Sequence, residues 1–258
     1  MIPKVIHYCW FGGNPLPPLA EKCIASWKKF LPDYQIKRWD ESNFDVNMIP
    51  YTSQAFEAKK YAFVSDYARF WILYNYGGIY FDTDVEVLRP MDDIIAAGPF
   101  MGCENPPANG NNADTSNLEP GLELGVNPGL GIGAPKGLNL YKELLNLYDS
   151  MSFIDEKGWL NTVTIVSYTT NLLCKYGLLN ISDIQNICGI KIYPVDYFCP
   201  IDYKSGKCAI TNNTYSIHHY AESWHGSKEK IYKFLGKIIG KNSAKKIANL
   251  IKRILIKH

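Results

Sequence analysis

The sequence predicts an α/β protein with a mostly parallel central sheet. A strand at residues 4–11, a helix at 19–30 and a strand at 34–39 follow one another at the spacing of a β–α–β unit. Such units pair their two strands in parallel. A longer helix begins at Tyr61, ends at a Gly-Gly pair (residues 77–78) and leads into another apolar strand. Hydrophobic residues make up 47% of the 258 residues, which is enough for a sizeable core.

The segment at residues 61–89 predicts a helix followed by a strand that carries two carboxylates. Aromatic side chains recur at spacings of three and four along the helix, as on one face of an amphipathic helix. The Gly-Gly pair suits a helix end, because glycine adopts positive φ at little cost. Asp82 and Asp84 are two residues apart, so an extended backbone points both side chains the same way. Neighbouring carboxylates repel unless a cation lies between them, which predicts a Mn²⁺ or Mg²⁺ site.

The rest of the chain continues the alternation of helices and strands. Residues 105–121 are rich in Pro, Asn and Gly and predict a surface loop. Residues 124–133 contain four glycines, which allow backbone to approach a ligand closely. The other predicted elements are a loop at 40–54, helices at 92–97, 138–151 and 169–176, and strands at 100–103, 191–194 and 214–220.

Charge and cysteine content indicate a cytoplasmic protein with a distinct tail. The seven cysteines form no CxxC pair, which argues for reduced thiols and against a zinc site. The N-terminus has no charged-then-apolar leader. Residues 228–258 contain ten basic residues and one acid, whereas residues 1–227 contain 17 basic and 24 acidic ones, a net charge of −7. No nucleic-acid partner is expected.

The tail is expected to be helical and separate, giving a domain at residues 1–227 and a basic amphipathic segment at 228–258. A helix with one apolar and one lysine-rich face can lie on an anionic membrane surface, here the inner face of the membrane. Alternatively, the apolar face packs on the domain and the lysines are solvated. Sedimentation with anionic vesicles distinguishes the two, because equal binding without the tail would exclude the membrane role.

Taken one at a time, the candidate site residues also have explanations that involve no function. The Asp82-Thr83-Asp84 triplet on its own is also compatible with a solvated turn. Asp66 and Arg69 lie three residues apart on the helix, and a surface pair at that spacing contributes only a few tenths of a kcal/mol. The position of Asp82 and Asp84 favours a functional role, because they follow a predicted buried aromatic strand, where burying an unpaired carboxylate costs free energy.

Three segments together resemble one family. IHYCWFGG near the N-terminus, SDYARFWILYNYGGIYFDTDVEVL in the middle and IHHYAESW near the end resemble the DXD-containing family-32 glycosyltransferases. These are bacterial capsule and cell-surface polysaccharide enzymes, with fungal mannosyltransferases and, more distantly, clostridial toxin glucosyltransferase domains as relatives. The resemblance covers roughly residues 1–227 and is weak between residues 148 and 200. It implies a nucleotide-sugar-binding fold of the GT-A type.

The resemblance also implies roles for residues that bind the donor. Trp10 would stack on the nucleotide base, with the backbone at Cys9 reading the edge of the base; the alternative for Trp10 is a core position. Asp66 would hold the ribose or the hydroxyls of the donor sugar. Arg69 would contact the sugar or a phosphate, and Tyr80 would contact the nucleotide.

A second group would hold the metal and the diphosphate. Asp84 would ligate the metal directly, and Asp82 would bridge the ribose and the metal. His218 is the candidate for a further metal or phosphate contact. Ser223 and Trp224 would close over the diphosphate; they are adjacent here, whereas one further residue separates them in the toxins.

The implied function is metal-dependent transfer of a hexose from a nucleotide sugar, with UDP favoured, to a glycan or lipid-linked acceptor. Asp82, Asp84 and Arg69 would be catalytic, and the family implies retention of configuration. Asn127 is a candidate for the acceptor side, or a turn residue, and His219 is expected to be structural. The alternatives are a haloacid-dehalogenase-like phosphatase, which also uses a DxD after an apolar strand, and a non-catalytic nucleotide-sugar-binding protein.

Overall fold

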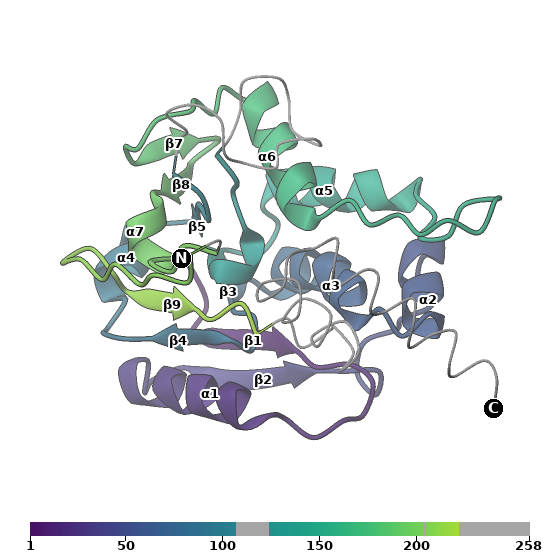
Figure 1. Cartoon of the computed structure of the whole chain (residues 1–258), viewed down its shortest axis with the longest axis horizontal. Coiled ribbons are helices and arrows are strands. Elements are labelled where there is room, and N and C mark those ends of the chain that lie inside the picture. Colours follow the sequence, from purple (N-terminus) through teal and green to yellow (C-terminus); the bar gives the residue numbers. More distant parts are fainter. Residues whose placement is uncertain (107–123, 204, 222–258) are drawn as a thin grey trace. The chain divides into compact units, whose positions relative to one another are not determined.

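The structure is a computed structural model that describes residues 1–106, 124–203 and 205–221. Residues 1–220 form one compact unit. Its centre is a seven-stranded sheet with the strand order β2-β1-β3-β6-β5-β8-β7, and β4 and β9 form a separate two-stranded sheet (Figure 1). None of the helices in these described ranges is long and apolar enough to cross a membrane.

The predicted β–α–β unit is confirmed. Its elements are β1 (Val5–Cys9), α1 (Pro18–Phe30) and β2 (Gln35–Trp39). β1 pairs in parallel with β2 and, on its other side, with β3 (Gly78–Tyr80). The predicted long helix is α3 (Tyr61–Tyr76), which ends at Gly77 with a positive φ of 66°. A glycine is suited to that conformation because it has no Cβ.

The remaining strands make the sheet mixed but mostly parallel. β6 (Ile132–Ala134) runs antiparallel to both of its neighbours, β3 and β5 (Phe100–Gly102). β8 (Ile190–Tyr193) is parallel to β5, and β7 (Gln185–Ile187) is antiparallel to β8. Five of the seven strands therefore run in one direction, which confirms the predicted α/β class.

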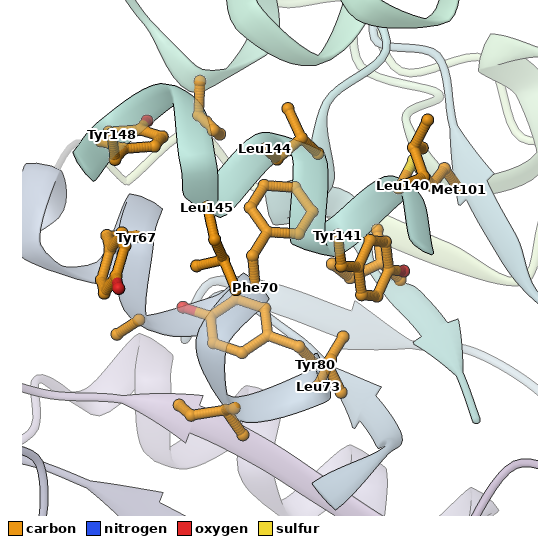
Figure 2. Packing of buried hydrophobic residues seen from close by; sticks show 14 of the residues in the cluster. Tyr67, Phe70, Leu73, Tyr80, Met101, Leu140, Tyr141, Leu144, Leu145 and Tyr148 are labelled. Atoms are coloured by element: carbon orange, nitrogen blue, oxygen red, sulfur yellow. The ribbon is translucent and has the colours of Figure 1, made fainter. Parts of the chain in front are cut away.

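Side chains alternate between the two faces of the central strands. Ile6 and Ile79 pack in the same apolar cluster as Trp27 of α1, on one face. Cys9 and Tyr80 belong to the cluster on the other face, which contains α3 and α5 (Asn139–Asp149). Figure 2 shows this second cluster, in which the Phe70 and Tyr141 rings of the two helices lie 5.0 Å apart. This alternation turns Tyr80 toward α3.

Several elements differ from the sequence prediction. The predicted loop at 40–54 gives way to α2 (Pro50–Glu57), which begins with Pro50 at a position where helices tolerate proline. α6 (Ile165–Lys175) begins earlier than predicted, because Thr164 caps it by accepting a hydrogen bond from Ser167 N. β7 and α7 (Val195–Phe198) were not predicted. The other described elements are α4 (Asp92–Ala96), a 3₁₀ turn at Pro128–Leu130 and β9 (Ser216–His218).

The prediction that Asp82 and Asp84 lie on one extended strand is wrong. β3 ends at Tyr80, and the next strand, β4 (Val85–Val87), belongs to the other sheet, where it pairs with β9. The two acids lie in the turn between these strands, closed by a 3.1 Å hydrogen bond from Val85 N to Asp82 O. β3 pairs with β1 at Ile79 and Tyr80 and with β6 from Gly78 to Tyr80, so the ladder ends before Asp82.

A buried histidine ties β1 to the end of α3. His7 Nε2 lies 3.0 Å from the carbonyl oxygen of Gly77, and His7 Nδ1 lies 3.0 Å from the indole Nε1 of Trp39. A carbonyl only accepts and an indole only donates, so Nε2 carries the proton and Nδ1 does not. Burial lowers the pKa of His7 to about 4, against the opposing effect of the bond to Gly77 and with a further lowering from Lys37.

The lowered pKa of His7 predicts an acid-labile fold. The unfolded chain binds a proton near pH 6.5 and the folded chain only near pH 4. The stabilisation is therefore complete above pH 6.5 and is lost as the pH falls toward 4. The loss from this residue is about 3 kcal/mol at most. Urea unfolding of the wild type and of His7→Gln at pH 7 and pH 4.5 measures it, because glutamine can donate to Gly77 but does not titrate. Equal loss of stability in both proteins would contradict this assignment.

Candidate active site

The turn after β3 gathers two carboxylates and an imidazole. One ligand atom from each of Asp82, Asp84 and His218 lies within 4.8 Å of the others. His218, the last residue of β9, reaches Asp84 because β4 and β9 pair with Val85 opposite His218. Its Nε2 lies 3.2 Å from Asp84 Oδ1. The Asp82 side chain is 28% exposed and that of Asp84 is 16% exposed, so the cluster is open to solvent on the Asp82 side.

These three groups fit a divalent cation by their chemistry. Carboxylate oxygens suit Mg²⁺ and Mn²⁺, and imidazole suits transition metals such as Mn²⁺. Burial lowers the pKa of His218, but Asp84 next to it raises that pKa well above its ordinary value. The pKa of Asp82 is raised by burial and by Asp84, against the opposing effect of Arg69. A positively charged His218 thus pairs with Asp84, and a metal bound through the same imidazole would displace its proton.

A buried arginine joins this turn to α3. Arg69 is 3% exposed, and its Nη2 lies 2.9 Å from Asp66 Oδ1 and 3.3 Å from Asp82 Oδ1. The pair is therefore not a solvated surface pair. Burial raises the pKa of Asp66 to about 7, although Arg69 opposes the shift and Asp82 adds to it. One guanidinium thus serves two carboxylates, and a hydroxyl-rich ligand that donates to Asp66 would relieve its desolvation.

Tyr80 completes the link between the sheet and the turn. Its hydroxyl donates to Asp82 Oδ1 over 3.0 Å, and the Arg69 guanidinium lies over its ring, 5.0 Å from the centroid. The alternation of β3 turns Tyr80 toward α3, and its hydroxyl meets Asp82 in the turn that follows the strand. Cys9 lies on the same side, and burial raises the pKa of its thiol to about 12. Cys9 is therefore a neutral thiol and not a nucleophile at physiological pH.

Trp10 follows the end of β1 and is half-buried. Its indole Nε1 donates to Asn14 O over 2.7 Å, and its backbone nitrogen donates to Trp39 O over 2.8 Å. These bonds fix the loop after β1 in place. The stacking role predicted for Trp10 and the backbone role predicted for Cys9 stay predictions.

Asn127 is a turn residue in the structure, which was one of the two alternatives, and its role on the acceptor side stays a prediction. Its amide is engaged on both sides: Nδ2 donates to Glu104 Oε2 over 2.8 Å, and Oδ1 accepts from Gly129 N over 2.7 Å. It thereby caps the short 3₁₀ turn beside Asp82. Glu104 and Gly129 were missed from the sequence. A lone Glu after a short strand carries no signal, and the glycine-rich stretch indicated only that backbone there approaches something closely.

Part of the predicted site lies outside the described residues. Ser223, Trp224 and the tail at 228–258 belong to that part, so their roles stay predictions. His219, predicted to be structural, has its ring nitrogen Nε2 2.8 Å from Glu86 Oε2, which also accepts from Lys22 over 2.8 Å. This ion-pair group lies between α1, β4 and the end of β9.

Taken together, the described side chains offer an anionic cluster for a cation and a buried, positively charged neighbour. Asp82 belongs to both, since it contacts Arg69 and lies in the cluster with Asp84. Such an arrangement can hold a metal-bound diphosphate at the open side while Asp66 and Arg69 offer one acceptor and one donor for hydroxyl groups.

Comparison with known proteins agrees with this geometry. Residues 17–101 match the family model described as "Glycosyltransferase sugar-binding region containing DXD motif". The matched range includes Asp66, Arg69, Tyr80 and both acids of the turn.

Curated relatives carry matching names. The chain is 24% identical over 247 residues to inositol phosphoceramide mannosyltransferase 1 of Schizosaccharomyces pombe, covering 90% of this chain and 65% of the relative. It is 33% identical over 118 residues to inositol phosphoceramide mannosyltransferase 3 of the same yeast, covering 43% and 32%. The chain thus spans less than two thirds of the length of these relatives. Among solved structures, the PaToxG glycosyltransferase aligns with a TM-score of 0.48 and 20% identity over 67% of this chain and 69% of that one.

These matches agree with the predicted enzyme class but not specifically with the predicted bacterial subtype. The curated relatives with these names are fungal mannosyltransferases, so the narrower prediction of a bacterial polysaccharide enzyme stays a prediction. Residues 17–101 of this chain are similar to the glycosyltransferase sugar-binding region containing a DXD motif, and the curated relatives that the chain matches are named as mannosyltransferases.

Proposed function

We propose that this protein transfers a hexose from a nucleoside diphosphate sugar, with UDP favoured, to a hydroxyl group of a glycan or lipid-linked acceptor. The fold would be of the GT-A type, the cation Mn²⁺ or Mg²⁺, and the configuration at the sugar carbon retained. The observation that carries the proposal is the cluster of Asp82, Asp84 and His218 joined through Asp82 to the buried Arg69.

The reaction breaks the bond between the sugar C1 and the diphosphate oxygen and forms one between C1 and the acceptor oxygen. The leaving diphosphate gains negative charge, and a divalent cation held by Asp82, Asp84 and His218 would stabilise it as a Lewis acid, by several kcal/mol. The proton of the acceptor hydroxyl passes to an oxygen of the leaving diphosphate. No side chain in the described part of the chain is assigned as a covalent nucleophile.

The chain's own residues would orient the donor. Arg69 is already fixed by Asp66 and by Ser65 O, which accepts from its Nε over 3.2 Å. Because it needs no reorganisation, it can donate to a sugar hydroxyl or phosphate oxygen at little entropic cost. Asp66 would accept from a donor hydroxyl, and a hydrogen bond to its charged form would lower its raised pKa.

The names of the curated relatives inform the substrate class. They name mannose as the transferred sugar and inositol phosphoceramide as the acceptor. A hexose donor and a lipid-linked acceptor hydroxyl are therefore the first substrates to test here. Synthesis of a cell-surface glycan at the inner face of the membrane is the proposed setting.

The phosphatase alternative fits the site less well. It uses the first acid of the motif to attack phosphorus, and in this structure one oxygen of that acid, Asp82 Oδ1, is already engaged by both Arg69 and Tyr80. A non-catalytic binding protein remains the second candidate, because a binding site does not by itself require turnover.

Nucleotide sugars are expected to stabilise the protein only when the metal is present. A ligand present at 100 times its Kd and bound only to the native state adds about 2.7 kcal/mol to the free energy of unfolding. We expect UDP-hexoses to raise Tm with Mn²⁺ and not with EDTA, and the Asp84→Asn variant to show no shift. Stabilisation by GDP-hexoses alone would show that the donor nucleotide carries guanine and not uracil. The absence of any shift in Tm would contradict the proposed function. Stabilisation without release of nucleoside diphosphate in the presence of acceptors would favour the non-catalytic alternative.

A further inference from the structure

A chain of three hydrogen bonds runs from Glu104 to the Asp82 backbone. Glu104 Oε2 accepts from Asn127 Nδ2 over 2.8 Å, and Asn127 Oδ1 accepts from Gly129 N over 2.7 Å. Gly129 O in turn accepts from Asp82 N over 3.1 Å. These three hydrogen bonds connect Glu104 to Asp82, the first acid of the turn, through the Asn127 side chain and the backbone of Gly129.

Contact between Gly129 and Asp82 is closer than any other residue would allow. A Cβ on Gly129 would lie 2.1 Å from Asp82 Oδ2 and 3.0 Å from Asn127 Oδ1. The backbone of Gly129 thus lies directly against the carboxylate of Asp82, while Arg69 and Tyr80 hold Oδ1 of the same carboxylate. Any displacement of Gly129 would move Asp82 or open space behind it.

The chemistry of the chain fixes its direction. A carboxylate only accepts and a backbone N–H only donates, so the amide must turn its NH₂ toward Glu104 and its oxygen toward Gly129. Asn127 is 8% exposed, so this amide has little access to water as a substitute. Burial raises the pKa of Glu104, and the hydrogen bond from Asn127 and the nearby positive charge of His218 both oppose that rise.

We propose that Glu104 and Asn127 are positioning residues that hold Gly129 against Asp82 and so fix the Asp82 carboxylate where the cation and the donor bind. This role rests on the proposed function, since it keeps the Asp82 carboxylate in one position within the proposed metal and donor site. Neither residue is required to touch the substrate, so Asn127 acts here without the direct acceptor contact that the sequence suggested.

An exchange of amide and carboxylate tests the pair. Asn127→Asp places two carboxylates against each other where a 2.8 Å hydrogen bond was. Glu104→Gln keeps an acceptor for the Asn127 amide. In the double variant, the glutamine amide introduced at position 104 would supply the N–H. The aspartate introduced at position 127 would accept from it and from Gly129 N, so the chain is restored with the charge moved. Mn²⁺ affinity, measured by electron paramagnetic resonance of free Mn²⁺, reads out the position of the carboxylate without requiring turnover.

We expect Asn127→Asp to weaken Mn²⁺ binding by about tenfold or more and Glu104→Gln to weaken it by at most about threefold. The Mn²⁺ affinity of the double variant should recover to within about threefold of the wild type, since residues in contact couple strongly. Glu104→Leu, which adds no like charge, should weaken binding in the same direction if Asn127→Asp does not fold. The control is Asn213→Asp, because Asn213 Nδ2 donates to Asp196 Oδ2 over 2.9 Å at an exposed site; it should leave Mn²⁺ affinity unchanged.

Two results would overturn the positioning role while leaving the function intact: wild-type affinity in Asn127→Asp, or a double variant no better than Asn127→Asp. Failure of the wild-type protein to bind Mn²⁺ would overturn the proposed function together with the positioning role. The melting temperature of each metal-free variant separates these outcomes from a general loss of structure, which would lower Tm without rescue in the double variant.

Discussion

Replacing Asp84 by asparagine is expected to reduce metal-dependent donor hydrolysis and sugar transfer by about a thousandfold, which corresponds to ~4 kcal/mol of lost transition-state stabilisation. The substitution keeps the size of the side chain but removes the charge that the cation requires. Asp82→Asn should behave alike, with additional loss from its contacts to Arg69 and Tyr80. Steady-state kinetics at saturating Mn²⁺ and circular dichroism together provide the measurement.

The control for this prediction is a carboxylate elsewhere on the surface. Asp33 pairs with Lys4 over 3.2 Å and both side chains are well exposed. Asp33→Asn should therefore retain turnover. Turnover like that of the wild type in Asp84→Asn would exclude a role for this carboxylate in holding a catalytic metal.

Replacing Arg69 by methionine is expected to destabilise the fold by about 3–5 kcal/mol, because it leaves buried carboxylates without their cation. Arg69 is the partner of both Asp66 and Asp82, and the loss should appear in urea unfolding at pH 7. The pKa of Asp66 is already raised to about 7, above that of the unfolded chain, so its ionised form opposes folding as the pH rises through that range. The destabilisation of Arg69→Met should therefore be larger at pH 8 than at pH 5.

Two variants complete this test. Asp66→Asn combined with Arg69→Met removes one of the stranded charges and should recover part of the lost stability, while activity stays low. Arg38→Met is the more exposed counterpart: Arg38, whose side chain is 38% exposed, pairs with Asp40 over 2.9 Å, and pairs near the surface contribute about 0–1 kcal/mol. A cost for Arg69→Met no larger than that for Arg38→Met would contradict a buried, shared guanidinium.

The sequence predicts the local structure of this site better than its three-dimensional connections. Spacing along the helix predicts that Asp66 and Arg69 share one face, and they form an ion pair on α3 in the structure. The position of Arg69 between two carboxylates depends on how α3 packs against β3, which no local pattern encodes. A surface pair at the same spacing has the same sequence signature.

The errors have equally specific causes. Asp82 and Asp84 converge through a turn and not through an extended strand, because β4 leaves the central sheet to pair with β9. An Asp-Thr-Asp triplet is compatible with both conformations. Glu104 could not be found from the sequence, because its role comes from a contact with Asn127, 23 residues along the chain, that only the folded backbone brings within 2.8 Å.

Location of the cation tests the central claim most directly. Crystals grown with Mn²⁺ and UDP, measured at the manganese absorption edge, give an anomalous signal that identifies the metal independently of any other density. We predict one strong peak within coordination distance of Asp82 and Asp84, with the diphosphate beside it on the side of Arg69. A peak elsewhere, with these two carboxylates bare, would contradict the assignment of the metal to this turn.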